Sequence, residues 1–226
     1  MKEKRVMGID ILTVLFDGKL QEREIPSFRG AIIAISGRNP IFHNHAEGEE
    51  LILRYPHIQY KAINGQAALV GIREGAEALR RLFVPGAMHV LKIGRDYREF
   101  YVRELLENVF EPSLVPGSFK RYHVHNWLPL NSENYAEYQS MHSLAGRISK
   151  LDTILTGNVL SLYKGLGVFV EEEVEAHVVG LEERMVTFKD VKMTAFEAVI
   201  ECNFTLPERC GLGKGASHGF GVVRES

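Results

Sequence analysis

The stretch Gly211-Leu212-Gly213-Lys214-Gly215-Ala216-Ser217-His218-Gly219-Phe220-Gly221 carries five glycines in eleven residues, arranged as two Gly-apolar-Gly triplets separated by five residues. Glycine is used where the backbone needs a positive φ or where another group must approach closely. We therefore expect a loop whose backbone N–H groups point outward and form a concave site for an anion. Lys214 and His218 lie inside the loop, and Arg209 and Arg224 flank it, so the local charge favours a phosphate-bearing ligand.

Two familiar phosphate-binding loops do not fit this stretch. A nucleoside-triphosphate P-loop needs Gly-Lys-Ser/Thr at the start of a helix, whereas Lys214 is followed by Gly215. A dinucleotide-binding loop follows a strand and opens a βαβ unit of about 30 residues. Here the residues 220–223 instead read as a strand that follows the loop. The remaining alternative is a flexible glycine-rich linker.

The composition is that of a globular protein. The chain has 226 residues, 45% hydrophobic and 25% charged, enough for one large domain or two of about 100 residues each. The formal net charge of −2 excludes binding to nucleic acid by bulk positive charge, so a polyanion must be met by a local patch.

Cysteine usage and the absence of targeting signals predict a cytoplasmic protein. The two cysteines, Cys202 and Cys210, are too few for a disulfide scaffold or a four-cysteine zinc site and favour a reducing compartment. The first residues lack the apolar core of a signal peptide. No apolar run approaches the roughly 18 residues of a membrane helix, so no membrane partner is expected.

The first half of the sequence predicts the element order strand, helix, strand, strand, helix, strand. The predicted strands are 7–16, 58–63, 66–72 and 88–93, and the predicted helices are 28–35, capped by Ser27, and 74–83. Asn64-Gly65 between two apolar runs is a strong signal for a β-hairpin. This βαββαβ order is that of the ferredoxin-like fold.

The second half of the sequence predicts another α+β unit. Strand-like runs cover 119–128, 174–181, 185–193 and 196–206, and helical runs cover 133–147 and 148–163. We therefore predict an α+β fold of two tandem ferredoxin-like (RRM-like) units with a C-terminal glycine-rich loop. The predicted domains are 1–95, with the candidate catalytic histidines, and 96–226, with the loop.

Histidine pairs supply the candidate catalytic groups, since imidazole can take and give a proton near neutral pH. His43 and His45 bracket Asn44 in a polar loop after the first helix. Residues two apart in extended chain share a face. One imidazole could take the proton of a ribose 2′-hydroxyl that attacks phosphorus, and a second group could protonate the leaving 5′-oxygen. Candidate transition-state or phosphate contacts are Tyr55, Lys61 and Arg54, with Tyr60 as an alternative to Tyr55 and Lys214 as a further cation.

Two other interpretations of these histidines stay open. A zinc site needs three or four ligands at suitable spacing, and the chain has no recognised zinc pattern, so no metal and no cofactor are expected. The histidines could also simply form hydrogen bonds in a surface loop. For the pair His43 and His45, in a chain with a phosphate-suited loop, catalysis is the favoured interpretation.

The residues also resemble a known family. The stretch 211–221 is similar to the glycine-rich loop of the repeat-associated mysterious protein (RAMP) superfamily of CRISPR proteins. The segments Phe28-Arg29-Gly30, Pro40-Ile41-Phe42-His43-Asn44-His45, Arg54-Tyr55-Pro56 and Ile58-Gln59-Tyr60-Lys61 resemble the CRISPR-associated endoribonuclease that cuts precursor CRISPR RNA within its repeats. The two regions lie near opposite ends, so the resemblance spans nearly the whole chain.

The resemblance implies an activity and a division of roles. It implies two ferredoxin-like units side by side with RNA along a cleft, and metal-independent cleavage that leaves a 2′,3′-cyclic phosphate and a 5′-hydroxyl. It gives His43 or His45 the role of general acid or base. It assigns RNA binding to the loop residues Gly211, Gly213, Lys214, Gly215, Ser217, His218, Gly219 and Gly221.

Two function hypotheses follow. In the first, the protein is a repeat-specific endoribonuclease acting in antiviral CRISPR defence. In the second, it is a non-catalytic scaffold subunit that grips RNA in a CRISPR effector complex. CRISPR repeat RNA is the expected partner in both, and effector subunits or a second copy in a homodimer are further candidates.

Overall fold

The structure, a computed structural model, describes residues 8–42 and 55–226. The chain divides into two compact units, of which the first is Met1–Glu111 with Ser217–Gly219 and the second is Pro112–Ala216 with Phe220–Ser226. Across the two described stretches, no helix is both long and apolar enough to cross a membrane.

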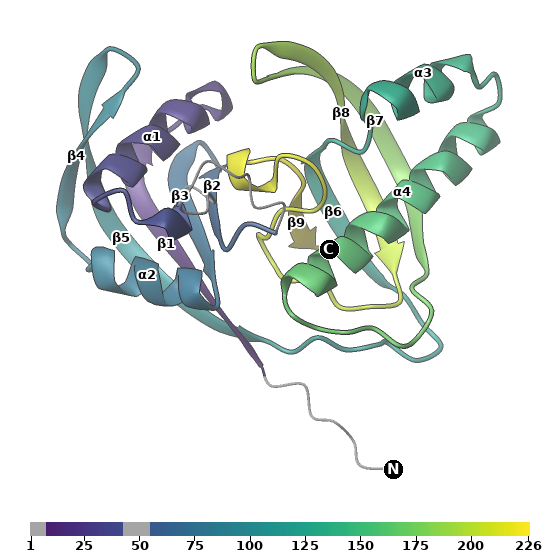
Figure 1. The fold of residues 1–226 in the computed structure, drawn as a ribbon, viewed down its shortest axis with the longest axis horizontal. Helices are drawn as coiled ribbons and strands as arrows, with labels where there is room; N and C mark the ends of the chain where they lie inside the picture. The colour runs from purple at the N-terminus through teal and green to yellow at the C-terminus, as the bar shows by residue number, and fades with distance from the viewer. Residues whose placement is uncertain (1–7, 43–54) are drawn as a thin grey trace. The chain divides into compact units, whose positions relative to one another are not determined.

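The first unit is a five-stranded antiparallel sheet with two helices on one face (Figure 1). Its strand order is β2-β3-β1-β5-β4. Its elements are β1 (Ile9–Lys19), η1 (Glu22–Glu24), α1 (Ile25–Ile35), η2 (Pro40–Phe42), β2 (Ile58–Ile63), β3 (Gln66–Ile72), α2 (Glu74–Leu82), β4 (Met88–Ile93) and β5 (Asp96–Phe110). The order β2-β3-β1-β5 is that of a ferredoxin-like sheet, and β4 is an additional strand at its edge.

Local sequence signals explain several of these elements. Asn64 and Gly65 have φ values of 51° and 74° and join β2 to β3 with Ile63 opposite Gln66, which confirms the predicted hairpin. The predicted helix at 74–83 is confirmed as α2. The start of α1 differs from the prediction: the helix begins at Ile25 with Pro26 in its first turn, so Ser27 lies inside it.

The fourth strand of the first sheet is not the one that the sequence indicated. Residues 88–93 do form a strand, but β4 pairs only with β5, and β5 pairs with β1 from Ile9 opposite Phe110 to Phe16 opposite Val102. A boundary between residues 95 and 96 would fall inside the β4–β5 hairpin, whereas the division between the compact units follows Glu111. The order of elements along the chain cannot distinguish the two strands, because their partners are set by long-range pairing.

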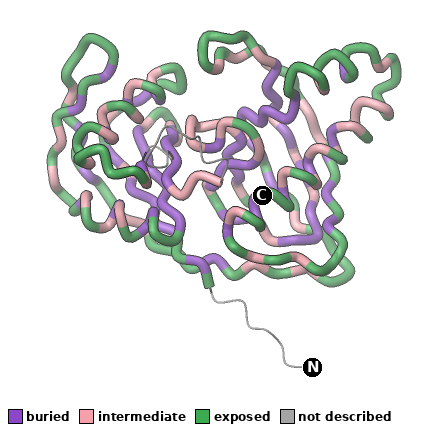
Figure 2. The backbone as a smooth tube through the Cα atoms, viewed as in Figure 1, coloured by how far each residue is buried: buried purple, intermediate pink, exposed green. Residues whose placement is uncertain are grey.

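The core of the first unit lies between the sheet and its helices (Figure 2). Phe16 of β1 makes edge-to-face contacts with Phe28 of α1, Phe83 after α2 and Phe100 of β5, with ring centroids 5.4–6.3 Å apart. All four rings are buried. They join α1 and the end of α2 to β1 and β5.

The second unit is a four-stranded antiparallel sheet in the order β7-β8-β6-β9. Its elements are β6 (Lys120–Trp127), α3 (Ser132–Ser140), α4 (Leu144–Gly165), β7 (Ala176–Phe188), β8 (Val191–Cys202), η3 (Ala216–His218) and β9 (Val222–Glu225). This is the ferredoxin-like strand order, with α3 and α4 in the first crossover. In place of a second crossover helix, the chain between β8 and β9 carries the glycine-rich loop.

The start of α4 provides a small test of this unit. The Ser143 hydroxyl accepts a hydrogen bond from the Gly146 N–H at 3.1 Å and caps the helix. Ser143→Ala should lower the free energy of unfolding of the second unit by about 1 kcal/mol. Urea titration followed by the fluorescence of Trp127, the one tryptophan of the chain and a buried residue of β6, measures this change. Ser161→Ala, exposed within the same helix, is the control and should change it by less than about 0.5 kcal/mol.

Candidate functional site

The glycine-rich loop, residues 211–221, is closed by backbone hydrogen bonds at its two ends. The Leu212 N–H donates to the Gly221 carbonyl at 2.7 Å, and the Val223 N–H donates to the Cys210 carbonyl at 2.9 Å. Gly211 forms a β-bridge with Val222. These bonds join the two ends of the loop in a narrow neck, formed by residues 210–212 and 221–223. The loop is therefore closed and ordered, which favours the anion-binding interpretation over a flexible linker.

The glycines of this loop meet the requirements that the sequence suggested. Gly213, Gly215, Gly219 and Gly221 have φ values of +79°, +76°, +85° and +64°. A Cβ atom on Gly221 would lie 2.0 Å from the Leu212 carbonyl oxygen, and one on Gly213 would lie 2.3 Å from Asn158 Oδ1. These positions therefore need glycine for two reasons, the backbone conformation and the space available.

Cations and aromatic rings gather beside the loop within the second unit. The Phe220 ring packs edge-to-face on Phe188 at the end of β7, with centroids 5.3 Å apart. The ammonium groups of Lys214 and Lys189 lie 5.8 and 5.7 Å from the Phe188 centroid, and both lysines are exposed. Sequence reasoning singled out Lys214 but missed Phe188 and Lys189, because only the pairing of β7 with β8 brings their turn to the loop.

The tip of the loop is part of the first unit. The Ser217 hydroxyl lies 2.9 Å from His218 Nδ1, so these neighbouring side chains are hydrogen-bonded. A Cβ atom on Gly219 would lie 2.4 Å from Ile25 Cδ1 and 3.4 Å from the Tyr60 carbonyl oxygen. The glycine at 219 thus allows the tip to lie against the start of α1 and the middle of β2.

Tyr60 also holds the chain just before the candidate histidines. Its hydroxyl donates a hydrogen bond of 2.7 Å to the Phe42 carbonyl, and its side chain is fully buried. Burial raises the pKa of Tyr60 far above its usual value, so the hydroxyl stays neutral and remains a donor. Tyr60 therefore fixes the end of η2 and has no exposed hydroxyl to offer to a phosphate.

The other predicted site residues are only partly described. His43, His45 and Arg54 lie outside the described residues. Tyr55 is half-buried at the edge of the described stretch that leads into β2. Lys61 lies within β2 and is fully buried, so its ammonium group does not face solvent.

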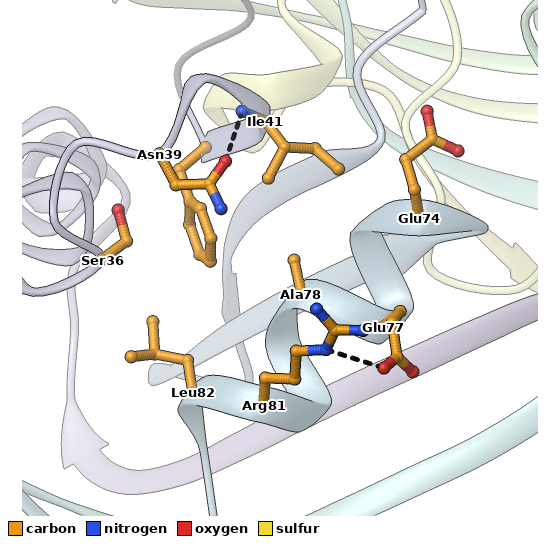
Figure 3. Close-up of a pocket in the computed structure, with 9 residues that line it drawn as sticks. Ser36, Asn39, Ile41, Glu74, Glu77, Ala78, Arg81 and Leu82 are labelled. Carbon is orange, nitrogen blue, oxygen red and sulfur yellow. Dashed lines mark hydrogen bonds and ion pairs between the residues drawn. The ribbon is translucent and has the colours of Figure 1, made fainter.

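A surface hollow of about 450 Å³ opens between the end of α1, η2 and α2 (Figure 3). Its charged lining residues are Glu74, Glu77 and Arg81. Side-chain hydrogen bonds from Arg81 and Arg80 lower the pKa of Glu77, so this carboxylate is ionised at neutral pH. Two carboxylates and one guanidinium give this lining a net negative charge, which does not suit a phosphate. Phe42 also forms part of the wall of the hollow.

Within residues 8–42 and 55–226, the chain holds no cluster of three or more His, Cys, Asp or Glu side chains that could bind a metal ion. Cys202 and Cys210 are buried and are not joined in a disulfide, and burial raises the pKa of Cys202 to about 11. Neither thiol is therefore a ready nucleophile at neutral pH.

Comparison with known families accounts for both units. A model of the Cas6b N-terminal domain matches residues 7–111, and a model of the Cas6b C-terminal domain matches residues 115–226. The chain belongs to the Cas6b family. The gap between the two Cas6b domain matches coincides with the division of the structure after Glu111. The predicted membership of the RAMP superfamily is thereby confirmed.

Individual relatives agree with this assignment. A crystal structure of Cas6b superposes with a TM-score of 0.86 at 26% identity, covering 97% of this chain and 100% of that one. A second, of a CRISPR RNA processing endoribonuclease Cas6b, has a TM-score of 0.74 at 23% identity with the same coverage. An uncharacterized protein of Methanocaldococcus jannaschii is 37% identical over 97 residues, which are 43% of this chain and 65% of that protein, slightly less than two thirds of its length. The predicted α+β fold of two units is confirmed.

Proposed function

We propose that this protein is an endoribonuclease that cleaves precursor CRISPR RNA within its repeats. The observation that carries the proposal is the match of both halves of the chain to Cas6b domains. A solved protein of the same fold bears the name CRISPR RNA processing endoribonuclease. The closed loop with its exposed Lys214 supports a phosphate-binding role in this chain.

The proposed reaction is an internal transesterification without a metal ion. One imidazole of the pair His43 and His45 takes the proton of a ribose 2′-hydroxyl, whose oxygen forms a bond to the adjacent phosphorus. The bond from phosphorus to the 5′-oxygen breaks, and the other imidazole protonates that oxygen. The products are a 2′,3′-cyclic phosphate and a 5′-hydroxyl.

Two contacts within the first unit link the loop tip, Ser217–Gly219, with the chain that leads to the histidines. The Tyr60 hydroxyl holds the Phe42 carbonyl, one residue before His43, and Gly219 lies against the Tyr60 carbonyl. Because Lys61 is buried, we propose Arg54 or Tyr55 as the group that stabilises the phosphorane, and give Lys61 a supporting role within β2.

The reaction should proceed in the presence of a chelator. Repeat RNA incubated with the protein in excess EDTA should be cut at one position, with a rate within about twofold of that in magnesium. The 5′-fragment should resist ligation at its 3′-end until its cyclic phosphate is removed. The 3′-fragment should be phosphorylated at its 5′-hydroxyl by polynucleotide kinase and ATP without prior treatment. RNA with a 2′-deoxy nucleotide immediately before the cut should bind but remain intact.

Other outcomes distinguish the alternatives. Loss of cleavage in EDTA would reject the metal-independent reaction. Tight binding of repeat RNA without cleavage under any condition would instead indicate the scaffold function in an effector complex.

A further inference from the structure

β6 contains a bulge opposite a single carboxylate of β8. Val124 pairs with Ala198 and Trp127 pairs with Phe196, so two residues, His125 and Asn126, face Glu197 alone. Such an extra residue bends a strand and locally disrupts its ladder. Asn126 is buried and has a φ of +52°, a left-handed conformation that is uncommon among non-glycine residues and that asparagine adopts more readily than most.

Glu197 contacts the bulge through both of its carboxylate oxygens. The His125 Nδ1–H donates to Oε2 at 2.8 Å, and the Asn126 backbone N–H donates to Oε1 at 3.3 Å. Arg184 of β7 donates to the same Oε1 at 2.9 Å. The carboxylate therefore joins three strands at the bulge and satisfies a backbone donor that the disrupted ladder releases.

The bulge contacts the far end of the glycine-rich loop, and Trp127, the residue that follows the bulge, contacts the near end. At the far end, the Gly221 N–H donates to the Asn126 carbonyl at 3.1 Å. At the near end, the Trp127 indole N–H donates to Asn158 Oδ1 at 2.9 Å, and the Gly213 Cα packs so closely on this pair that a Cβ would lie 2.3 Å from the oxygen and 3.3 Å from the indole nitrogen.

We propose that Glu197 is a positioning residue for RNA binding: it fixes the bulge at His125 and Asn126, and through Asn126 and the adjacent Trp127 the bulge positions the two ends of the glycine-rich loop. The RNA part of this inference rests on the proposed function. Glu197 acts through the backbone and need not contact RNA. Replacing Glu197 leaves Lys189 and Lys214 beside the loop. It removes the hydrogen bonds that hold the bulge, and the bulge then no longer orients the backbone N–H groups of the loop.

Glu201 provides a matched control. It lies four residues further along β8, and its carboxylate accepts hydrogen bonds from the guanidinium of Arg121, which is on β6. Glu197→Ala and Glu201→Ala therefore each remove a carboxylate of β8 that contacts β6. Only Glu197→Ala removes contacts to the bulge.

The first measurement uses repeat RNA that carries a 2′-deoxy nucleotide before the cut, so that binding is separated from cleavage. Glu197→Ala should raise the Kd by about tenfold or more, while Glu201→Ala should leave it within about twofold. With unmodified RNA at saturating protein, the single-turnover cleavage rate of Glu197→Ala should stay within about threefold of the wild type.

The second measurement is hydrogen exchange without RNA. Amides of residues 211–222, the Gly221 amide above all, should exchange at least about tenfold faster in Glu197→Ala and at the wild-type rate in Glu201→Ala. Asn126→Gly, which keeps the left-handed backbone, should retain both loop protection and RNA affinity. Asn126→Val, a β-branched residue at positive φ, should lose both.

Two results would overturn the inference. Glu197→Ala could retain wild-type loop protection and affinity, or Glu201→Ala could lose as much of both as Glu197→Ala. A wild type that does not bind repeat RNA would reject the proposed function and the RNA part of the inference, and the exchange comparison would still decide whether Glu197 holds the loop.

Discussion

Replacing His43 and His45 together with alanine should lower the single-turnover rate of repeat cleavage by about a thousandfold or more, because each proton transfer contributes about 10²–10⁴-fold. Affinity should change little, since neither imidazole is assigned to RNA binding. The rate is measured at saturating protein in EDTA, and the Kd with RNA that carries a 2′-deoxy nucleotide before the cut. His177→Ala, an exposed histidine of β7, is the control and should cleave at the wild-type rate.

Chemical rescue separates the roles of the two histidines. When sulfur replaces the 5′-bridging oxygen at the cut, the leaving group no longer needs a proton. The single variant that lacks the general acid should then recover most of its rate, and the variant that lacks the general base should not. Wild-type cleavage by the double variant, or equal rescue of both single variants, would reject the assignment of this pair.

Replacing Gly221 with alanine should disrupt the glycine-rich loop. The backbone at Gly221 has a φ of +64°, where an L-residue costs about 1–2 kcal/mol, and the new Cβ would lie 2.0 Å from the Leu212 carbonyl oxygen. The neck of the loop has to open, which also removes the hydrogen bond from Leu212 to Gly221. We expect the free energy of unfolding of the second unit to fall by about 3 kcal/mol and the RNA affinity to fall about a hundredfold.

A control at Gly117 separates the cost of the positive φ from the cost of the Cβ clash. Gly117 lies in the same unit with a φ of +68°, but a Cβ there would meet no atom within 4 Å. Gly117→Ala should therefore lower the free energy of unfolding by only about 1 kcal/mol and leave RNA binding unchanged. Urea titration followed by Trp127 fluorescence and a filter-binding Kd measure the two quantities. If Gly221→Ala behaved like Gly117→Ala in both, the closed neck would not matter for RNA binding.

The sequence predicted several parts of the fold that are determined locally. The hairpin at Asn64-Gly65 and the helix from Glu74 follow from turn chemistry and hydrophobic periodicity, which involve only neighbouring residues. The place of β5 beside β1 did not follow, because residues 100–110 were ambiguous between strand and helix and only long-range pairing places β5 beside β1. The same limit applies to Glu197. Nothing in the sequence distinguishes it from the other acidic residues, and only the register of β6 and β8 places it opposite the bulge.

The candidate site was predictable to a similar extent. The positive φ values at Gly213, Gly215, Gly219 and Gly221 agree with the use of glycine that the sequence indicated, because conformational freedom is a property of the residue itself. The burial of Lys61 was not predictable, since a lysine in a strand-like run gives no sign of what covers it. The roles of His43 and His45 stay a prediction for the double variant to test.

The path of the chain between its two compact units affects how the protein can fold. The chain leaves the first unit after Glu111, returns for Ser217–Gly219 and leaves again at Phe220. A recombinant fragment that stops at Glu111 would therefore lack a piece of its own unit, and we expect it to be less stable than the same unit in the intact protein. Contacts across such a large sequence separation slow folding. The fragment that ends at Glu111 should consequently gain stability when it is co-expressed with the second half of the chain, which carries Ser217–Gly219.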